Sequence, residues 1–328
     1  RGAERGMSRR PLEVRVFSPE LGERWDAFVR ASKNGTFLFE RGFMGYHADR
    51  FVDHSLIVSG ADGEWLALLP AHRCGARVET HGGLSYGGFV VGERMTTPSM
   101  LEVFAATERF LAAQGAIEVL YKTVPHVYHR LPAEEDRYAL FRAGAALVRR
   151  DVLSVIEPAR RLRMQQRRQR AVRRARASGV RVRGEQSFER FWQLLTAALA
   201  ARHGMTPTHS LSEITLLAAR FPRAITLWIA EREDRLLAGV VVFDTPNVAH
   251  AQYIASSDEG RECGALDLLF ERLLGEVCSQ KRWFDFGISN EEAGQVLNVG
   301  LVEQKEGFGA RAVVHDHYLW TLGGRGEA

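Results

Sequence analysis

Several short runs in the first half of the chain alternate between apolar and polar residues, and each run predicts a β-strand. In two longer segments the apolar residues recur at helical spacing, which predicts amphipathic helices. The predicted strands are residues 12–17, 55–60, 65–72, 116–124 and 146–157, and the predicted helices are residues 19–32 and 98–114. A turn around Ala61-Asp62-Gly63 makes the second and third strands a hairpin. The first half therefore predicts a mixed α/β unit.

The second half shows the same pattern. Its predicted strands are residues 224–233, 235–247, 248–257, 283–289 and 310–322. A glycine-containing turn at 258–264 opens a predicted helix at 265–278, and residues 297–309 predict a short helix or turn. This half also opens with a basic helix followed by a short strand around Gly179-Val180.

The two halves align in register at a constant offset of 167 residues. At this offset Tyr86 pairs with Tyr253, Leu101 with Leu268, and Glu118 with Asp285. Each half is expected to contain a strand with a tyrosine, a polar turn, a helix and a strand with an acidic residue. We therefore predict an α/β fold of tandem copies of one unit, each a mixed central β-sheet flanked by helices, with domains at residues 10–155 and 156–322.

The composition narrows the class of protein. The 328 residues are 45% hydrophobic and 26% charged, which is typical of a soluble globular protein. No apolar run is long enough to span a bilayer, and the charged N-terminus lacks the apolar core of a secretory signal. Three widely spaced cysteines argue against a disulfide framework and against a cysteine-based zinc site. A cytoplasmic location is the expectation.

The positive charge is distributed unevenly along the chain. Eleven arginines lie between Arg160 and Arg183, although the net charge of the whole chain is only +4. Such a block indicates an anionic partner, such as a phosphate, a nucleotide, tRNA or a lipid head group, or else a solvated helix face. Arg163, Arg167, Arg170 and Arg174 lie on one stripe of the predicted helix. The family resemblance described below implies that one or two of these arginines grip the phosphates of the acceptor or donor, with the others solvated.

The turn at 258–264 has the order in which proteins build an anion-binding loop, namely a strand, a glycine-bearing turn and a helix start. It resembles a degenerate form of the GNAT pyrophosphate loop, R/Q-x-x-G-x-G/A. Arg261 and Gly264 match this pattern, and Leu266 stands where the last glycine or alanine is expected. The resemblance implies that Arg261, Gly264 and Ala265 contact the acyl donor, with Tyr253 as a neighbour.

A more specific resemblance lies further along the chain. Residues 284–287 read FDFG, and residues 300–309 read GLVEQKEGFG. They resemble the Fem-type aminoacyltransferases and their relatives, whose C-terminal GNAT unit carries an F-D-x-x-G strand and then G-L-x-x-x-K-x-x-F-G. The matching residues are Phe284, Asp285, Gly300, Leu301, Lys305, Phe308 and Gly309. Residues 34–51 and the basic helix add weaker similarity, and His47 and Arg50 stand where Fem proteins tend to have a lysine.

The resemblance implies an N-acyltransferase that forms an amide on an amine-bearing acceptor, such as an amino sugar or another cell-envelope precursor. The expected co-substrate is acyl-CoA, and the alternative donor is aminoacyl-tRNA. Two other readings remain open: a catalytically silent scaffold whose arginine helix binds nucleic acid, and a protein acting on a lipid-linked precursor at a membrane surface.

Amide formation passes through a tetrahedral oxyanion, so the site needs a positive group and a proton acceptor. Lys305 is the candidate for oxyanion stabilisation, with a surface ion pair as the alternative. Asp285, flanked by aromatic residues, is a candidate general base or amine anchor, or else it pairs with an arginine. Ser289, Asn290 and Glu291 follow at the carboxyl end of that strand, where open α/β sheets bind ligands.

Two histidines complete the list of candidates. His209 and Glu213 are four residues apart, so they share one face if the segment is helical there, and His209 is then a candidate base. The alternative is a helix cap made by the Thr/Ser-containing segment and Glu213. No third ligand at useful spacing supports a metal site, and none is expected. His81 and Tyr86 lie in the glycine-rich segment 80–92, where glycines allow close backbone approach to a substrate.

Overall fold

The computed structural model describes residues 11–323, except for the side chains at positions 202 and 203. The charged N-terminal segment used in the signal-peptide argument lies outside this part of the chain. Within it, no helix is both long and apolar enough to cross a membrane.

The chain folds into two compact units. Unit 1 consists of the residues up to 148 and those from 316 onward, and unit 2 consists of residues 149–315. The chain enters unit 2 within strand β8 (Ala146–Ile156) and returns to unit 1 within strand β16 (Arg311–Thr321). These boundaries differ from the expected 10–155 and 156–322, because the end of the last strand pairs within unit 1.

Unit 1 contains two groups of strands. The first is an antiparallel sheet in the order β1-β2-β3-β6, and in the second β4 pairs with β5, β5 runs parallel to β7, and β7 pairs with the second half of β16. The strands of unit 1 are β1 (Glu13–Val16), β2 (Leu56–Ser59), β3 (Trp65–Leu69), β4 (His72–Cys74), β5 (Arg77–Glu79), β6 (Val90–Val91) and β7 (Glu118–Lys122).

The helices of unit 1 close its core. Helix α3 begins where the Thr96 side chain accepts a hydrogen bond from Ser99 N–H, and its buried face includes Val103, Phe104 and Leu111. These residues join one apolar cluster with strands β2, β3 and β7. The helices of unit 1 are α1 (Gly22–Ala31), α2 (Arg41–Met44), α3 (Thr97–Ala113) and α4 (Glu135–Arg142).

Unit 2 is built on one twisted sheet in the order β8-β13-β12-β11-β10-β9. Strands β9 to β12 are antiparallel, β12 and β13 run parallel, and β13 pairs antiparallel with β8. The remaining strands of unit 2 are β9 (Arg181–Glu185), β10 (Ile225–Arg232), β11 (Arg235–Asp244), β12 (Val248–Ser256), β13 (Trp283–Ile288), β14 (Asn290–Glu291) and β15 (Val296–Leu297).

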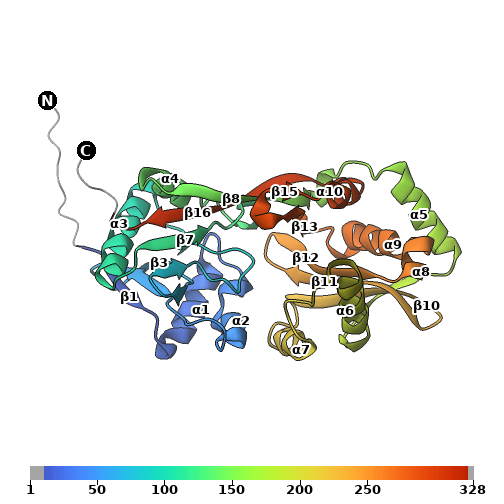
Figure 1. Cartoon of the computed structure of the whole chain (residues 1–328), viewed down its shortest axis with the longest axis horizontal. Coiled ribbons are helices and arrows are strands. Elements are labelled where there is room, and N and C mark those ends of the chain that lie inside the picture. The colour runs from blue at the N-terminus through green and yellow to red at the C-terminus, as the bar shows by residue number, and fades with distance from the viewer. Residues whose placement is uncertain (1–10, 324–328) are drawn as a thin grey trace. The chain divides into compact units, whose positions relative to one another are not determined.

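Helices cover both faces of this sheet (Figure 1). Helix α9 packs on one face, with Leu269 and Phe270 in a core that also contains Ala249, Ala251 and Phe284. Helix α6 packs on the other face, where the Phe191 ring lies directly over Gly239. The helices of unit 2 are α5 (Gln166–Ala177), α6 (Glu189–His203), α7 (Leu211–Arg220), α8 (Asp258–Cys263), α9 (Ala265–Arg272) and α10 (Val299–Glu306).

The predicted α/β fold of tandem units is confirmed, and two local predictions are wrong. The segment expected as a glycine turn is mostly the short helix α8, because the Ser257 hydroxyl caps it by accepting a hydrogen bond from Gly260 N–H. Tyr86 lies in a bend rather than in a strand, so the proposed match between Tyr86 and Tyr253 fails at the level of secondary structure. Helices α3 and α9, and strands β7 and β13, do follow the expected repeat.

Gly264, between α8 and α9, is expected to be essential for stability. Its φ is +84°, and a Cβ atom there would lie 2.6 Å from the carbonyl oxygen of Ala171 on α5. Gly264→Ala should therefore lower the free energy of unfolding by about 2 kcal/mol or more, measured by urea denaturation. Gly275→Ala is the matched control, because Gly275 has open space around its Cβ position and no positive φ. Equal stabilities of the two variants would contradict this account of the α8–α9 junction.

Candidate functional site

Strands β12 and β13 diverge in the middle of the unit 2 sheet. Their parallel pairing covers only Val248–His250 against Trp283–Asp285, although β12 continues to Ser256 and β13 to Ile288. On its other side β12 carries a β-bulge: Tyr253 pairs with Val241 and Ala251 with Val242, which leaves Gln252 as the extra residue. The bulge and the divergence together open the sheet beyond His250.

A cavity of about 250 Å³ lies where the two strands diverge. Its wall is mainly apolar, and its polar groups come from Arg261, Gln304 and Lys305. The lining residues come from α6, β12, α8, α9, β13 and α10, and include Leu195, Leu199, Ile254, Phe270, Phe286 and Phe308. An apolar pocket with a few polar groups suits the acyl part of a substrate.

Lys305 on α10 is buried, with 4% of its surface exposed. Its ammonium donates hydrogen bonds to the carbonyl oxygens of Gly287 (3.0 Å) and Ile288 (2.7 Å) and to the Ser289 hydroxyl (2.9 Å). Burial lowers the pKa of Lys305 to about 8, and nearby Asp285 opposes that shift. The alternative of a surface ion pair with a neighbouring glutamate is therefore wrong. Lys305 instead places a buried ammonium with a lowered pKa at the cavity wall.

Asp285 lies at the last position where β13 pairs with β12 and is 1% exposed. One carboxylate oxygen accepts a hydrogen bond from Gly287 N–H at 2.7 Å, and the other lies 3.1 Å from Nδ1 of His250. The structure thus gives Asp285 a histidine neighbour.

The polar residues after β13 shape the loop. Ser289 is buried and binds Lys305, while the Asn290 side chain accepts a hydrogen bond from Val152 N–H on β8. Glu291 is exposed and accepts a hydrogen bond from the Asn298 side chain at 2.8 Å. Of these three residues, only Ser289 contacts the cavity lysine.

His209 does not share a helix face with Glu213, because it precedes the cap of α7. Ser210 is the N-cap residue and forms a capping box with Glu213. The buried His209 ring instead hydrogen-bonds through Nδ1 to the Tyr253 hydroxyl on β12. Burial raises the pKa of Tyr253, so this phenol stays protonated at neutral pH.

The predicted donor-contact residues surround helix α8. The Arg261 guanidinium donates to the Ser256 carbonyl at 2.8 Å and pairs with Asp258, and Arg261 also lines the cavity. Gly264 forms the sharp junction to α9, and Ala265 is completely buried. Arg261 is thus the member of this group whose side chain reaches the cavity.

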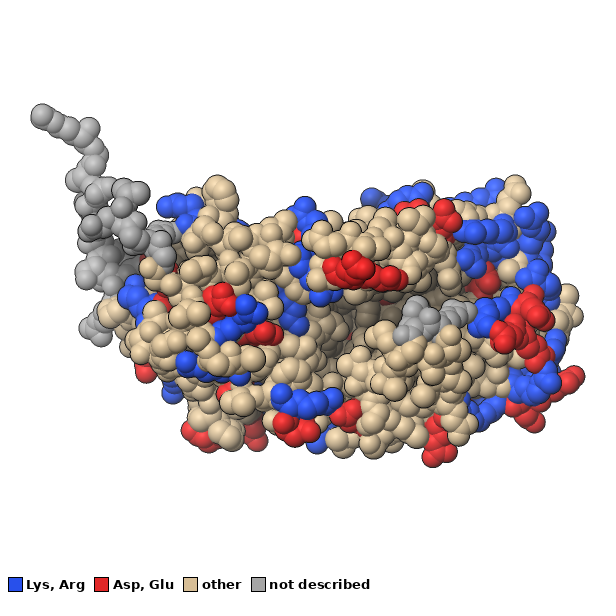
Figure 2. Space-filling view, viewed as in Figure 1, with Lys and Arg blue, Asp and Glu red and all other residues tan. Residues whose placement is uncertain are grey.

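The arginines of α5 fall into two sets. Arg167 donates to the Glu303 carbonyl on α10, and Arg168 pairs with Asp267 and lies over the Phe308 ring, so these two fasten α5 to the site. In contrast, the side chains of Arg170, Arg173 and Arg174 are exposed and make no hydrogen bond or ion pair within residues 11–323. Basic residues gather over this end of unit 2 in Figure 2.

His81 and Tyr86 belong to the interior of unit 1. His81 has φ +62° and stacks on His47 with ring centroids 4.9 Å apart, and burial with nearby His47 lowers its pKa to about 2. The Tyr86 hydroxyl donates to Thr36 Oγ1 at 2.9 Å. Both side chains are buried, at 3% and 4% exposure, so within unit 1 they act as packing groups.

His250 is the site residue that the sequence analysis does not identify. It lies on β12 and meets Asp285 from a strand 35 positions further along the chain. No local motif marks His250. The sequence features that could have pointed to it are the alternating pattern of β12 and the neighbouring FDFG strand.

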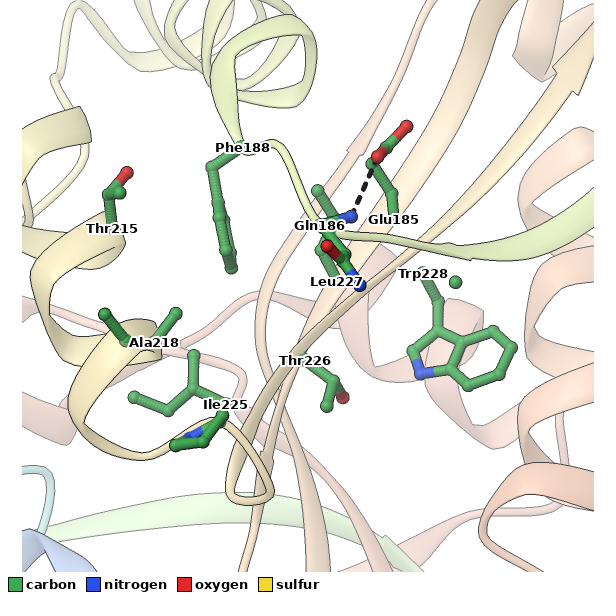
Figure 3. A pocket seen from close by; sticks show the side chains of 12 residues that line it. Glu185, Gln186, Phe188, Thr215, Ala218, Ile225, Thr226, Leu227 and Trp228 are labelled. Carbon is green, nitrogen blue, oxygen red and sulfur yellow. Dashed lines mark hydrogen bonds between the residues drawn. The ribbon is translucent and has the colours of Figure 1, made fainter.

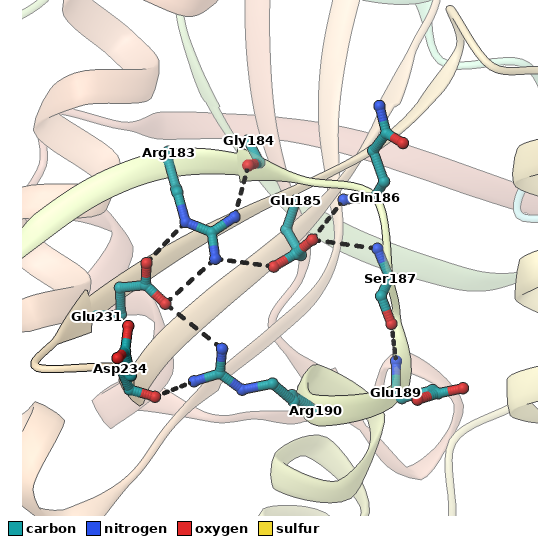
Figure 4. A network of polar contacts seen from close by, with 9 residues as sticks. All are labelled: Arg183, Gly184, Glu185, Gln186, Ser187, Glu189, Arg190, Glu231 and Asp234. Carbon is teal, nitrogen blue, oxygen red and sulfur yellow. Dashed lines mark hydrogen bonds and ion pairs between the residues drawn. The ribbon is translucent and has the colours of Figure 1, made fainter.

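A larger hollow of about 700 Å³ lies between α7 and strands β9 and β10 (Figure 3). It is lined by Phe188, Ile225, Leu227 and Trp228, and its charged group is Glu185. That carboxylate accepts hydrogen bonds from the backbone N–H groups of Gln186 and Ser187 and pairs with Arg183, within a network that fastens the edge strand β9 (Figure 4). No lysine or arginine is among the described residues that line this hollow, so the cavity at Lys305 is the better candidate.

The comparisons agree with this geometry. Residues 159–293 match the family described as an acetyltransferase (GNAT) domain, so this part of unit 2 carries a GNAT domain. The fold of the chain is similar to that of FemX, with a TM-score of 0.64 and 12% identity over 93% of this chain and 96% of FemX. No functionally curated protein matches the chain by sequence.

Two further solved structures share the fold. The C-terminal domain of a protein assigned as lysylphosphatidylglycerol synthetase from Agrobacterium fabrum gives a TM-score of 0.60 at 14% identity, covering 93% of this chain and 92% of that one. A tandem GNAT protein from the clavulanic acid pathway gives 0.50 at 13% identity, covering 96% and 100%. The solved structures confirm the predicted Fem-like, tandem-GNAT fold, and the family match confirms a GNAT acetyltransferase domain over residues 159–293.

The buried ammonium predicts a distinctive pH dependence of stability. The pKa of Lys305 is about 8 in the folded protein and near 10.5 in the unfolded chain, so between these values the unfolded state binds more protons and stability rises with pH. The gain should be up to about 3 kcal/mol between pH 7.5 and 10.5, relative to Lys305→Met measured by urea denaturation at both pH values. Parallel pH profiles for the two proteins would contradict the lowered pKa.

Proposed function

We propose that this protein transfers an aminoacyl group from aminoacyl-tRNA to the amine of an acceptor, such as an amino sugar or a related cell-envelope precursor, and forms an amide. Acyl-CoA is the alternative donor. The observation that carries the choice is helix α8, which stands in place of the open glycine turn expected there and contains Arg261, the first residue of the segment matched to the GNAT diphosphate pattern.

The first turn of α8 is already occupied by the protein's own groups. The Ser257 hydroxyl accepts a hydrogen bond from Gly260 N–H at 3.0 Å. Asp258 and Glu259 are the first two residues of the helix. Asp258 pairs with Arg261, and Glu259 pairs with Arg232 and Arg235. Two carboxylates at the helix start repel a diphosphate and neutralise the nearby arginines. This arrangement disfavours the grip that CoA requires.

The exposed arginines of α5 favour a larger polyanion. Arg170, Arg173 and Arg174 lie within a little more than one turn of helix, so they present one exposed, positively charged face. Arginine pairs with phosphodiester oxygens through two parallel hydrogen bonds. A tRNA backbone offers many such groups at a spacing that a helix face can meet.

The fold relatives bear on both donors. The name lysylphosphatidylglycerol synthetase includes a lysyl group, in line with an aminoacyl donor. The clavulanic acid tandem GNAT protein is described as solved without acetyl-CoA, which is in line with the alternative.

The cavity groups suit amide formation. The apolar wall between β12 and β13 receives the acyl side chain, and the Lys305 ammonium faces the developing oxyanion. All three Lys305 N–H groups have acceptors in this structure, and the Ser289 hydroxyl is the partner that can turn away when the oxyanion forms. Unit 2 therefore holds the groups proposed for the donor half of the reaction.

Direct donor binding tests this proposal. We expect calorimetry to show saturable, salt-dependent binding of alanyl-tRNA and no saturable binding of acetyl-CoA at physiological salt. The triple variant Arg170→Ala/Arg173→Ala/Arg174→Ala should bind the tRNA about tenfold more weakly, with a shallower salt dependence. Arg94→Ala, at an exposed arginine of unit 1, is the control and should bind like the wild type. Tight acetyl-CoA binding that Arg261→Ala abolishes would overturn the choice of donor and establish the alternative.

A further inference from the structure

We propose that His250 is the general base that takes the proton from the attacking amine, and that Asp285 holds its ring in position. The inference rests on the proposed amide-forming reaction, but not on which donor supplies the acyl group. It identifies a catalytic residue that neither the Fem-like motifs nor the GNAT pattern points to in this chain.

The hydrogen bonds of the pair fix the state of the imidazole. The Asp285 carboxylate is held on one side by Gly287 N–H at 2.7 Å and on the other by His250 Nδ1 at 3.1 Å. An ionised carboxylate can only accept, so Nδ1 carries the proton and donates. The lone pair of the neutral ring is then on Nε2, which is the arrangement a general base requires.

Nε2 is also accessible. The His250 side chain is 17% exposed, whereas the Asp285 side chain is 1% exposed. Within residues 11–323, His250 makes no hydrogen bond other than the one to Asp285. The Asp285 carboxylate is therefore the buried, fixed side of the pair, and His250 Nε2 is the side open to a reactant.

Gly287 joins this pair to the cavity lysine. It has φ +75°, and a Cβ atom there would lie 3.2 Å from Cε1 of His250, so a larger residue would crowd the ring. Its carbonyl oxygen accepts a hydrogen bond from the Lys305 ammonium. One glycine thus touches both the histidine and the loop that holds the lysine.

The position of the pair suits its task. His250 and Asp285 are the last paired residues before β12 and β13 diverge, and Phe286, the next residue, lines the cavity. The cavity wall thus begins one residue beyond the pair, and Lys305, which lines the cavity, is linked to Asp285 through the backbone of Gly287. Among the described residues, Asp285 from β13 faces the imidazole, and Lys305 from α10 lies across Gly287.

The proposed step balances as follows. The amine nitrogen attacks the acyl carbonyl carbon, a C–N bond forms, and the carbonyl electron pair moves to the oxygen beside Lys305. His250 Nε2 takes the proton from the attacking nitrogen. As the tetrahedral intermediate collapses, the bond from carbon to the leaving oxygen breaks, and the imidazolium gives that proton to the leaving oxygen. With an acyl-CoA donor the leaving atom is sulfur.

His250→Asn tests this role, because the asparagine amide can still donate to Asp285 but offers no base. Wild type and variant are assayed with glucosamine as acceptor and with alanyl-tRNA and acetyl-CoA in parallel. We expect a kcat about 10²- to 10³-fold lower, unchanged donor affinity and loss of the acidic limb of the pH–rate profile. His126→Asn, at an exposed histidine of unit 1, should behave like the wild type.

The outcomes separate the two proposals. Transfer only from acetyl-CoA would reject the tRNA donor while leaving the His250 comparison intact on that donor. A His250→Asn enzyme with wild-type kcat and pH profile would overturn the role of His250 with either donor.

A second measurement needs no substrate. The ¹⁵N NMR spectrum of the wild-type protein should show His250 as the Nδ1-protonated tautomer at neutral pH, and Asp285→Asn should shift it. The Nε2-protonated tautomer in the wild type would overturn the proposal even if glucosamine is not an acceptor.

Discussion

A buried ammonium needs acceptors, and the backbone of unit 2 is arranged to supply them. Lys305 finds them in the carbonyl oxygens of Gly287 and Ile288, at the point where β13 leaves β12. These carbonyls are free of hydrogen bonds to β12 because the parallel pairing has already ended. The positive φ of Gly287 turns the backbone so that they face the Lys305 ammonium. The lysine in turn ties α10 to the sheet and closes one side of the cavity. Removing the charge would leave the loop without its anchor.

The same divergence gives the site its chemistry. The apolar cavity opens between β12 and β13, and Lys305 of α10 lines it. The His250–Asp285 pair joins the same two strands just before they diverge. The N-terminus of α8, in contrast, is filled by its own serine cap and two acidic residues. The exposed arginines lie instead on α5.

Much of the fold could be predicted from the sequence because its strands alternate and its helices are amphipathic. Strands β10 to β13 and helices α3 and α9 are where the pattern predicts them. Helix α6 is missed, and α8 is taken for a turn, because glycine and short polar residues favour turns unless a neighbouring cap decides otherwise. At His209 the helix-cap alternative is the one the structure supports, because Ser210 and Glu213 form a capping box that starts α7 after the histidine.

The site was predictable only in part. Motif similarity marks Lys305 and Asp285, whose neighbours in sequence are conspicuous. His250 stands in an ordinary strand, and its meaning depends on a pairing between β12 and β13 that no spacing along the chain reveals. The division of the arginines into anchoring and exposed sets likewise depends on contacts with α9 and α10.

The central claim is that the acyl group binds where β12 and β13 diverge. The most direct measurement is a crystal structure with 3′-deoxy-3′-alanylamido-adenosine, a stable analogue of the aminoacylated tRNA end. We expect its alanyl group between Ile254 and Phe286, with the carbonyl oxygen within hydrogen-bond distance of the Lys305 ammonium. An alanyl group bound instead in the hollow lined by Phe188 and Trp228, with the cavity at Lys305 empty, would contradict the account.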